Sequence, residues 1–483
     1  MRYICPAGII APSLLLIFAG CQHLPPRPLN LPEIKLSLKE RPVDVAPVRA
    51  YADALAIASA ESVPTFDTSD GLNLNEGLAV ALWYNPDLRI ARIEMEQASA
   101  IAQTSGRWVD PELNVSGGRK EVTENTTESV TVGQGEGEKT YTWDVRKIAR
   151  SWISIGSLSI TVPVSGRLRV EKKLHQSEYY THILRVAEAE LFVLEEARNG
   201  WAHWSASQER IKLLDEYLAL LGRFAQTAES LAKVGELPSS NARLFMIEQM
   251  RKEAERDRER ANEAERRVSL LQTLGLLPDA AVELVPQLSI VYPPEVDILA
   301  LDEHPTIKRV RAEYQSVEDR LKVELRKQYP DLTFSPTYTE EKDESSFVLG
   351  FGFPLPVWNA NRQGIAEAAG ARDIARAKFE MEYQRLIAEV AQARAALAGS
   401  RAQRTRLMES VVPVIDQQMS EVLALMNVGE VDILLLYETL TQMLETQKEL
   451  LNAALAEALA VSRLAAVVAS DATAISASVE VEH

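Results

Sequence analysis

Cysteine, positive charge and long apolar runs are all scarce in this chain of 483 residues. Its only cysteines, Cys5 and Cys21, lie at the N-terminus, so the body of the protein has no disulfide framework. There are 52 Lys and Arg residues against 69 Asp and Glu residues, a net charge of −17. A nucleic-acid partner is therefore not expected, because phosphate binding needs a basic face. No apolar run of about 20 residues follows the N-terminal segment, and hence no membrane-spanning helix is expected.

Catalytic and metal-binding motifs are lacking as well. The chain has no Gly-rich phosphate loop and no HExxH motif, and its six His residues are scattered. His175 and His182 are seven residues apart and could share a helix face, but one pair does not make a metal site. The WAHW segment at 201–204 predicts packing between helices rather than a binding site. No enzyme activity, cofactor or bound metal is expected.

The N-terminal segment has the pattern of a secretion signal. Residues 9–19 are mainly apolar, and two small residues then precede Cys21. This pattern resembles a bacterial lipoprotein signal, although Phe18 stands where that signal usually has Leu. The resemblance implies that residues 1–20 are removed and that Cys21 carries lipid, while Gln22 in place of Asp favours sorting to the outer membrane. The alternative is an ordinary signal peptide with an incidental cysteine.

The chain also contains an internal duplication. The stretch 81–115 aligns without gaps with 300–334, and 8 of the 35 positions are identical, among them Pro86 with Pro305. Three further matches follow in order: ITVPV (160–164) with FGFPL (351–355), GRLRVEKK (166–173) with NRQGIAEA (361–368), and KVGELPSS (233–240) with NVGEVDIL (427–434). These matches predict a tandem repeat with connecting segments; two alanine-rich helical regions that align by chance are the alternative. The predicted boundaries are 21–71 (connection), 72–272 (first repeat), 273–296 (connection), 297–466 (second repeat) and 467–483 (tail).

Each repeat changes from a helical to an extended pattern at a proline. Apolar spacing predicts an opening helix of about 35 residues in each repeat. Alternating apolar and polar residues then predict β-hairpins at about 111–164 and 331–355. In the first hairpin, the polar stretch from about Glu121 to Arg150 is expected to connect the strands. Small residues between the aromatics suit a barrel whose outside contacts lipid, although a soluble β-sandwich would look similar.

A very long helical stretch follows each hairpin. Residues 167–233 contain no proline, and residues 361–427 contain one, Pro413. Each stretch of 67 residues corresponds to about 100 Å of helix. A VGE turn follows, and a helix about half as long returns. Since two shorter helices end to end match one long helix, each repeat is expected to form a paired rod.

Two hairpins per chain predict an oligomer if the strands enter a membrane. Four strands cannot close a barrel, and an open edge in lipid leaves backbone N–H and C=O groups unpaired. Known barrels have at least eight strands, so several chains must share one barrel. A dimer would supply eight strands and a trimer twelve.

Together, these residues resemble the TolC-like outer membrane factors, the exit ducts of Gram-negative tripartite efflux pumps and type I secretion systems. The resemblance covers nearly the whole mature chain and rests on the duplication, the NPDL and HPTI segments, the hairpin positions and both VGE turns. It implies a mostly α-helical homotrimer of tandem-duplicated long helical hairpins, with a shared twelve-stranded membrane barrel and a periplasmic helical tunnel. A lipidated Cys21 resembles the branch that serves resistance-type efflux pumps.

The family resemblance also assigns a role to the VGE turns. In the family, these turns receive the hairpin tips of the periplasmic adaptor. Glycine permits a tight helix–helix turn and close approach of a partner backbone, although it also serves where a turn is all that is needed. The predicted contact residues are Val234, Gly235, Glu236, Val428, Gly429 and Glu430.

Acidic rings narrow the family's tunnel near these turns. Leu435 stands at the usual acidic position here, which leaves Asp432 and Glu438 as candidates for the gate. Threefold symmetry would turn each into a ring of like charge that favours cations. The predicted function is a passive duct, opened by an adaptor and driven by an inner-membrane transporter. A type I protein secretion channel and a non-conducting coiled-coil periplasmic lipoprotein remain as alternatives, and the cargo is not predicted.

Overall fold

The computed structural model describes residues 24–58, 66–133, 139–288, 298–341, 344–427 and 433–468. The chain divides into two units, Met1–Val43 and Asp44–His483. The described part of the first unit contains helix α2 (Leu31–Lys39), which has a proline in its first turn and no buried side chain. The second unit contains the sheet and the long helices.

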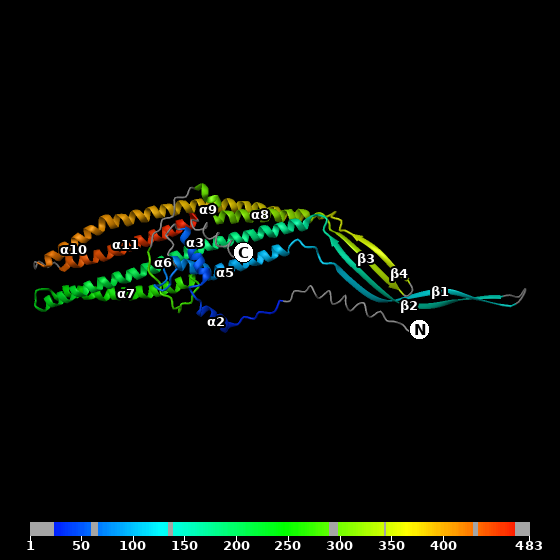
Figure 1. The fold of residues 1–483 in the computed structure, drawn as a ribbon, viewed down its shortest axis with the longest axis horizontal. Helices are drawn as coiled ribbons and strands as arrows, with labels where there is room; N and C mark the ends of the chain where they lie inside the picture. Colours follow the sequence, from blue (N-terminus) through cyan, green and yellow to red (C-terminus); the bar gives the residue numbers. More distant parts are fainter. Residues whose placement is uncertain are drawn as a thin grey trace. The chain divides into compact units, whose positions relative to one another are not determined.

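The second unit repeats one order of elements, which is helix, β-hairpin, long helix and returning helix (Figure 1). Within this unit one shorter helix, α3, precedes the first repeat, and a 3₁₀ segment precedes the second. The described elements are α3 (Ala46–Ala58), α4 (Leu74–Tyr84), α5 (Pro86–Thr104), β1 (Glu112–Val132), β2 (Lys139–Val162), α6 (Arg167–Lys233), α7 (Ser239–Thr273), a 3₁₀ segment (Ile298–Glu303), α8 (Pro305–Arg326), β3 (Leu332–Glu341), β4 (Glu344–Gly352), α9 (Arg362–Arg406), a π-helical turn (Leu407–Val411), α10 (Val412–Asn427) and α11 (Ile433–Val468).

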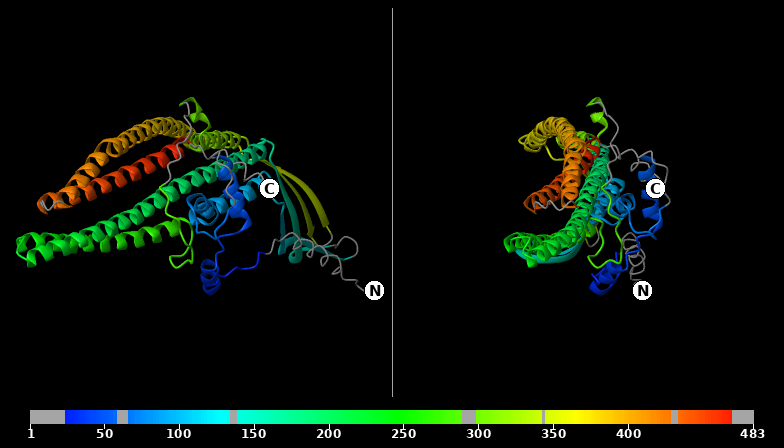
Figure 2. Two further views of the ribbon diagram at one scale, coloured as in Figure 1. Left: turned by 60° about the vertical axis from the view of Figure 1, so that its left-hand side comes forward. Right: turned by 90° about the vertical axis from the view of Figure 1, so that its left-hand side faces the viewer.

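The helices pack side by side in a fixed order. Helix α6 contacts α5 and α8 along the part near the sheet, and α7 and α11 along the rest; α9 contacts α8 and α11. The two returning helices, α7 and α11, each lie beside their own long helix in both further views (Figure 2). Near the sheet the order is α5, α6, α8 and α9, and farther from the sheet it is α7, α6, α11 and then α9 with α10. Short and long helices therefore alternate and form a wall of four helices.

The opening helices are shorter than predicted. The first repeat breaks into α4 and α5 at Asn85, and the second has only the 22 residues of α8 after His304. Proline follows each of these two residues and disfavours helical backbone at the residue before it. The expected helix of about 35 residues is therefore wrong in both repeats. The long helix α6, in contrast, covers the predicted residues 167–233.

The second long helix accommodates Pro413 through a change of helix type. A π-helical turn, Leu407–Val411, separates α9 from α10 just before the proline. Proline lacks an N–H and its ring clashes with the carbonyl four residues earlier, so a regular α-helix would be strained there. The wider turn moves that carbonyl away and lets the helical path continue.

The sheet is antiparallel and has the strand order β1-β2-β3-β4. Strands β1 and β2 pair continuously from Glu112 with Ser159 to Val132 with Lys139. The expected polar connection between Glu121 and Arg150 is therefore wrong, because most of that stretch belongs to the two strands. Threonine and valine are frequent in it, and these β-branched residues favour extended backbone even without a buried face.

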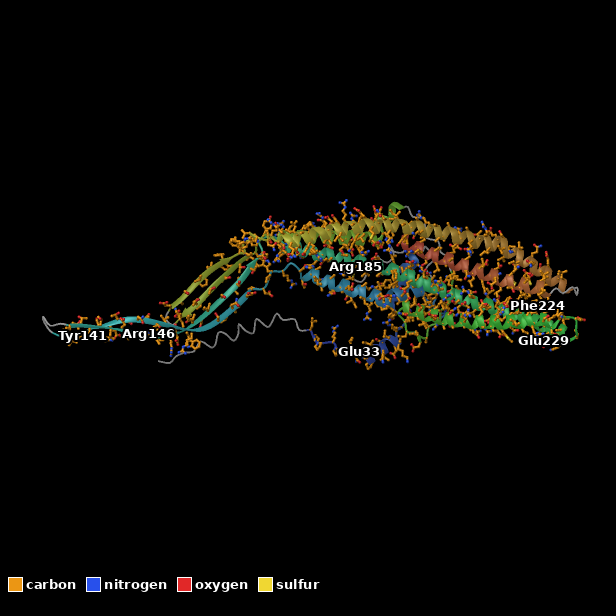
Figure 3. All side chains as sticks on the ribbon, turned by 180° about the vertical axis from the view of Figure 1, so that it is seen from behind. Glu33, Tyr141, Arg146, Arg185, Phe224 and Glu229 are labelled. Atoms are coloured by element: carbon orange, nitrogen blue, oxygen red, sulfur yellow. The ribbon has the colours of Figure 1, made fainter. Side chains whose placement is uncertain are left out.

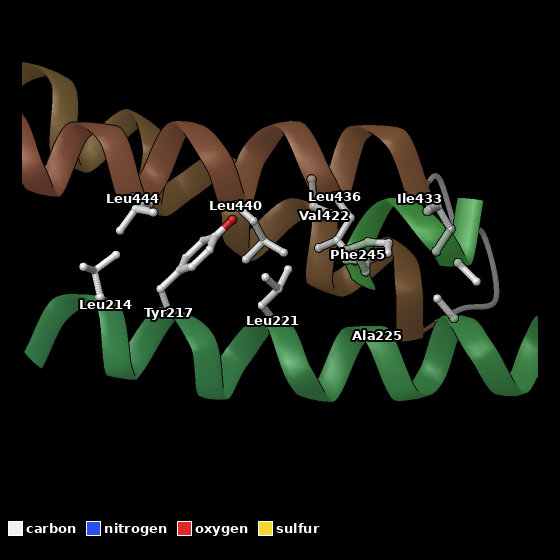
Figure 4. Close-up of a cluster of buried hydrophobic side chains, with 12 residues drawn as sticks. Leu214, Tyr217, Leu221, Ala225, Phe245, Val422, Ile433, Leu436, Leu440 and Leu444 are labelled. Carbon is white, nitrogen blue, oxygen red and sulfur yellow. The ribbon is translucent and has the colours of Figure 1, made fainter. Parts of the chain in front are cut away.

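Two regions of buried side chains hold the helices together. Near the middle, Trp201 is fully buried and Trp204 nearly so, which confirms the packing role predicted for the WAHW segment. A β-carbon added at Gly77 would lie 2.4 Å from the Trp201 ring, so only glycine lets α4 approach α6 this closely. Farther from the sheet, a hydrophobic cluster joins α6 and α7 to α10 and α11 (Figure 4).

Helix α11 is more apolar than the sequence survey indicated. Among the described helices, it alone is long and apolar enough to cross a membrane by length and composition. Nearly half of its apolar window is buried, against α9, α6 and α10. Packing within the wall of helices accounts for this composition.

Candidate functional site

The sheet has two unlike faces. One face, which we call the Phe351 face, carries apolar side chains along all four strands; Phe334 and Phe351 pair across β3 and β4 with ring centroids 5.2 Å apart. The opposite face, the Ser335 face, carries mainly small and polar residues, although Ile153, Ile155 and Val348 also lie on it. Pairing assigns Leu113, Val115, Leu158, Ile160, Phe334, Pro336, Tyr338, Phe347, Leu349 and Phe351 to the first face, and Asn114, Ser116, Ser157, Ser159, Thr333, Ser335, Thr337, Ser346, Val348 and Gly350 to the second.

The apolar side chains of the Phe351 face are exposed in the single chain. Leu113 is 63% exposed, Phe347 66% and Phe351 77%. Such a face is unfavourable in water and suits lipid, whereas small polar residues suit a water-filled interior. Strands β3 and β4 have 10 and 9 residues, the length that a tilted strand needs to cross a bilayer.

Aromatic residues mark the boundary between the sheet and the helices. Trp108 precedes β1, Tyr329 precedes β3 and Trp358 follows β4, and their exposed fractions are 59%, 60% and 91%. Tryptophan and tyrosine concentrate where a bilayer meets water, because their rings are apolar and their tips polar. These residues were not predicted from the sequence, although their positions beside the hairpins were a usable signal.

The far ends of the helices carry the predicted contact turns. Figure 3 shows Phe224 and Glu229 of α6 near this end, and Tyr141 and Arg146 of the sheet at the other. Of the predicted residues, Val234, Gly235 and Glu236 are described and exposed. Val428, Gly429, Glu430 and Asp432 lie outside the described residues, as does Cys21.

The first turn closes α6 in a compact and defined way. The Glu236 N–H donates to the Leu231 carbonyl at 3.0 Å and the Gly235 N–H to the Ala232 carbonyl at 3.3 Å. This pair of bonds is the Schellman motif, which needs a left-handed residue after the helix. Gly235 supplies it with φ +83°, and nothing lies within 4 Å of an added β-carbon. The turn is therefore closed by two backbone hydrogen bonds and leaves room for a partner at its surface.

Glu438 lies on the outer side of the helix end. It is exposed on α11, and Gln442 Nε2 donates to its carboxylate at 3.4 Å. Ile433, Leu436 and Leu440 point instead into the hydrophobic cluster (Figure 4). The carboxylate thus faces away from the packed interior.

Buried and partly buried charged side chains lie beside the cluster, between α7 and α11. Lys448 Nζ donates to Glu255 at 2.6 Å and Lys252 Nζ donates to the same side chain at 3.0 Å. Burial opposes the ionised form of Glu255, yet the two ammonium groups outweigh it and lower its pKa. Burial likewise opposes the charge on Lys252, but its carboxylate neighbours, Glu255 first, raise its pKa. The two returning helices are therefore joined by an ionised network as well as by apolar contacts.

The histidine pair of α6 does share a cavity. His175 and His182 line a space of about 260 Å³ between α5, α6 and α8. His175 Nδ1 lies 3.0 Å from Glu178, which also accepts a hydrogen bond of 2.7 Å from Arg320. Within the described part of the chain, no group of three or more His, Cys, Asp or Glu side chains is arranged to hold a metal ion. The charged groups of the cavity pair with one another and join the helices.

Comparisons with known proteins agree with this geometry. The family model "Outer membrane efflux protein" matches residues 298–470, which is the second repeat. A curated relative, the cobalt-zinc-cadmium resistance protein CzcC of Cupriavidus metallidurans, is 26% identical over 216 residues, covering 44% of this chain and 52% of the relative. The chain therefore matches about half the length of that relative.

Solved structures share the fold over most of the chain. The outer-membrane channel OprN matches with a TM-score of 0.68 and 15% identity, covering 82% of this chain and 89% of that chain. The outer membrane protein VceC from Vibrio cholerae matches with a TM-score of 0.65 and 15% identity, covering 82% and 95%. The predicted mostly helical fold with a small antiparallel sheet, the resemblance to outer membrane factors and the outer membrane location are confirmed.

Proposed function

We propose that this chain is the outer membrane exit duct of a tripartite efflux pump and conducts substrates passively. The observation that carries the proposal is the attachment of a sheet with one mainly apolar and one mainly polar face to a wall of four helices that pack side by side. The sheet suits a bilayer with water behind it, and the helices extend that water-filled path into the periplasm.

The free edges of the sheet support a shared barrel. Strands β1 and β4 are the outer strands, and each has one edge without a partner in the described sheet. Such an edge in lipid leaves backbone groups unpaired. Pairing β1 of one copy with β4 of the next removes both edges, and three copies then close a barrel of twelve strands.

Exposed apolar residues at the two edges of the helix wall support the same arrangement. On the edge formed by α5 and α7, Ile93 is 54% exposed and Met250 63%. On the edge formed by α9, Ile374 is 59% exposed and Met381 55%. The two edges differ, so copies would join head to tail and close into a ring.

The exposed turn Val234–Gly235–Glu236 is the proposed contact for a periplasmic adaptor, which in turn recruits an inner-membrane transporter. The repeat assigns the same role to Val428, Gly429 and Glu430. Asp432 and Glu438 are the proposed gate, since threefold symmetry would concentrate their charge around the axis. Cys21 is the proposed site of the lipid anchor.

Divalent metal cations are the proposed cargo. The relative CzcC is named for resistance to cobalt, zinc and cadmium. The net charge of −17 gives this chain a field that favours cations. Protein secretion through the same type of duct is the second candidate, and a non-conducting scaffold is the third.

Single-channel recording of the detergent-extracted protein in a planar bilayer, with its oligomer mass measured alongside, tests the duct. A trimer that conducts in discrete, cation-favouring steps is expected. A monomer that never conducts would favour the non-conducting scaffold over the duct. Expression of this chain in a metal-sensitive deletion strain would separate metal efflux from protein secretion, because a metal efflux duct would restore resistance.

A further inference from the structure

The β1–β2 hairpin continues far beyond the rest of the sheet (Figure 1). Its last contact with β3 is at Ile153, which pairs with Glu341. Beyond that point β1 and β2 pair only with each other, up to Val132 and Lys139. The eleven residues from Val122 to Val132 extend about 35 Å. We call the part of the hairpin formed by residues 122–132 and 139–149 the ribbon.

A ribbon of two strands is marginally stable when it stands alone in water. The strands β3 and β4 already have the length needed to cross a bilayer, so the ribbon lies outside the membrane in the proposed barrel. Its length and regular pairing therefore require further contacts that this single chain does not supply.

The polarity of the two faces reverses along the hairpin. Pairing between β1 and β2 has one register throughout, without a bulge, so the Phe351 face and the Ser335 face each continue into the ribbon. In the membrane part the Ser335 face is mainly polar, with Ile153, Ile155 and Val348 as its apolar members. In the ribbon the same face becomes the more apolar one and carries Val122, Val130, Val132, Tyr141, Trp143 and Val145.

The Phe351 face changes in the opposite direction. In the ribbon it is rich in threonine and other polar residues that bond across the strands. Thr127 Oγ1 donates to Asp144 at 2.8 Å, and the hydroxyls of Thr131 and Thr140 lie 3.2 Å apart. Polar groups of this face thus form hydrogen bonds across the strands, and the face suits contact with water outside the bilayer.

We propose that the Ser335 faces of three ribbons pack against one another above the barrel and narrow its outer mouth. The inference rests on the proposed function, because the shared barrel turns this face toward the axis. Beyond the membrane, the Ser335 face of each ribbon would therefore face the Ser335 faces of the other two ribbons across the barrel axis. Tyr141 is 58% exposed, Trp143 45% and Val130 47% in the single chain, and the contact would bury them.

Charge does not oppose this packing. The charged groups in the middle of the Ser335 face of the ribbon include Glu128 and Lys147, which form an ion pair of 3.0 Å within one ribbon. Glu124 stands directly opposite Lys147 in the pairing. The face that meets its copies is therefore close to neutral, with aromatic and valine side chains toward the tip.

Cysteine substitution tests the proposal directly. The chain has only two cysteines, and both lie in the first 21 residues, so a single new cysteine in the ribbon reports on its own position. Val130→Cys on the Ser335 face is compared with Ser129→Cys, its neighbour on the opposite face, using oxidation and a short bis-maleimide on the intact oligomer in membranes. Most of the Val130→Cys protein is expected to become cross-linked dimer, and little of the Ser129→Cys protein.

A second measurement tests the effect on the duct. The double substitution Tyr141→Ala and Trp143→Ala is expected to raise single-channel conductance, since it removes the bulk that narrows the mouth. If the protein forms conducting trimers, two results would each overturn the proposed packing of the ribbons but not the proposed function. One is equal cross-linking at positions 129 and 130, and the other is unchanged conductance in the double variant. A parent protein that neither trimerises nor conducts would instead overturn the proposed function. Ribbons that fold back onto lipid would cross-link at neither position.

Discussion

Asn85 and His304 perform the same task at equivalent positions of the two repeats. Asn85 Oδ1 accepts from the Asp87 and Leu88 N–H groups that open α5, while its Nδ2 donates to the Thr273 carbonyl at the end of α7, at 2.9 Å. His304 Nδ1 accepts from the Thr306 N–H that opens α8, at 3.2 Å, and its Nε2 lies 3.4 Å from the Ala466 carbonyl of α11.

Each of these side chains therefore joins two short helices end to end. Both lie before a proline, which sets the helix start and removes one unpaired N–H. This joint gives the NPDL and HPTI segments a physical reason to recur 219 residues apart. It keeps α5 in line with α7, and α8 in line with α11, along a single long helix in each repeat.

We expect Asn85→Ala to lower the free energy of unfolding by about 1–2 kcal/mol, since it removes a helix cap and leaves the half-buried Thr273 carbonyl without that donor. Asn85→Asp is the informative control, because it keeps the cap acceptor and loses only the donor. Denaturant unfolding in detergent measures both. Equal stability of the alanine variant and the parent would contradict a role for this joint.

Acid is expected to weaken the second joint before the first. Burial lowers the pKa of His304, so the folded state favours the neutral ring. The corresponding stability is complete above the unfolded pKa of about 6.5 and is lost as pH falls through the lower folded value. His304→Asn, copied from the first repeat, should abolish this part of the pH dependence. Thermal unfolding between pH 7 and pH 5 would show it, and an unchanged profile in the variant would argue against His304 as the source.

Gly77→Ala is expected to destabilise the middle of the molecule by about 1–3 kcal/mol through overpacking, because its β-carbon would overlap the buried Trp201 ring. Gly222→Ala in α6 is a matched control, since nothing lies within 4 Å of its added β-carbon. It should be neutral or raise stability by about 0.5–1 kcal/mol. If both substitutions shifted the melting temperature in the same direction, the result would contradict the close contact between Gly77 and Trp201.

The ion network between α7 and α11 should show its own pH window. The lowered pKa of Glu255 contributes stability above about pH 4.5, which is lost as pH falls through the folded value. The raised pKa of Lys252 contributes stability below about pH 10.5, lost as pH rises through the folded value. Lys252→Met should cost about 1–3 kcal/mol by leaving Glu255 with one ammonium partner fewer. Adding Glu255→Leu should restore part of the loss, and a further fall in stability would count against the network.

Two neighbouring residues of β4 offer a test of the faces. Leu349→Arg is expected to impair insertion into the outer membrane, since a charge on the lipid face costs about 2–4 kcal/mol near the bilayer centre. Val348→Arg lies on the opposite face and should insert normally while lowering the conductance for cations. Membrane fractionation and planar-bilayer recording distinguish the two. Normal insertion of both variants would contradict the assignment of the Phe351 face to lipid.

Much of this fold could be read from local patterns. The helix 167–233 and the positions of both hairpins were predictable, because helical and extended periodicities are properties of neighbouring residues. The breaks at Asn85 and His304 were not predicted, although the following prolines were visible. The strands within Glu121–Arg150 were also missed, since neither of their faces is buried in this chain and no clean alternation is required there.

The repeat, the long helices, the exposed turn at Gly235 and the two unlike faces of the sheet follow from local sequence, because each depends on residues close together in the chain. The order of the four helices, the joints made by Asn85 and His304, and the ion network around Glu255 are visible only in the folded protein. These features depend on contacts between residues as many as 268 positions apart, the separation of Arg463 from Glu195. Such contacts are set by packing and by the pairing of buried charges, for which a local pattern carries no signal.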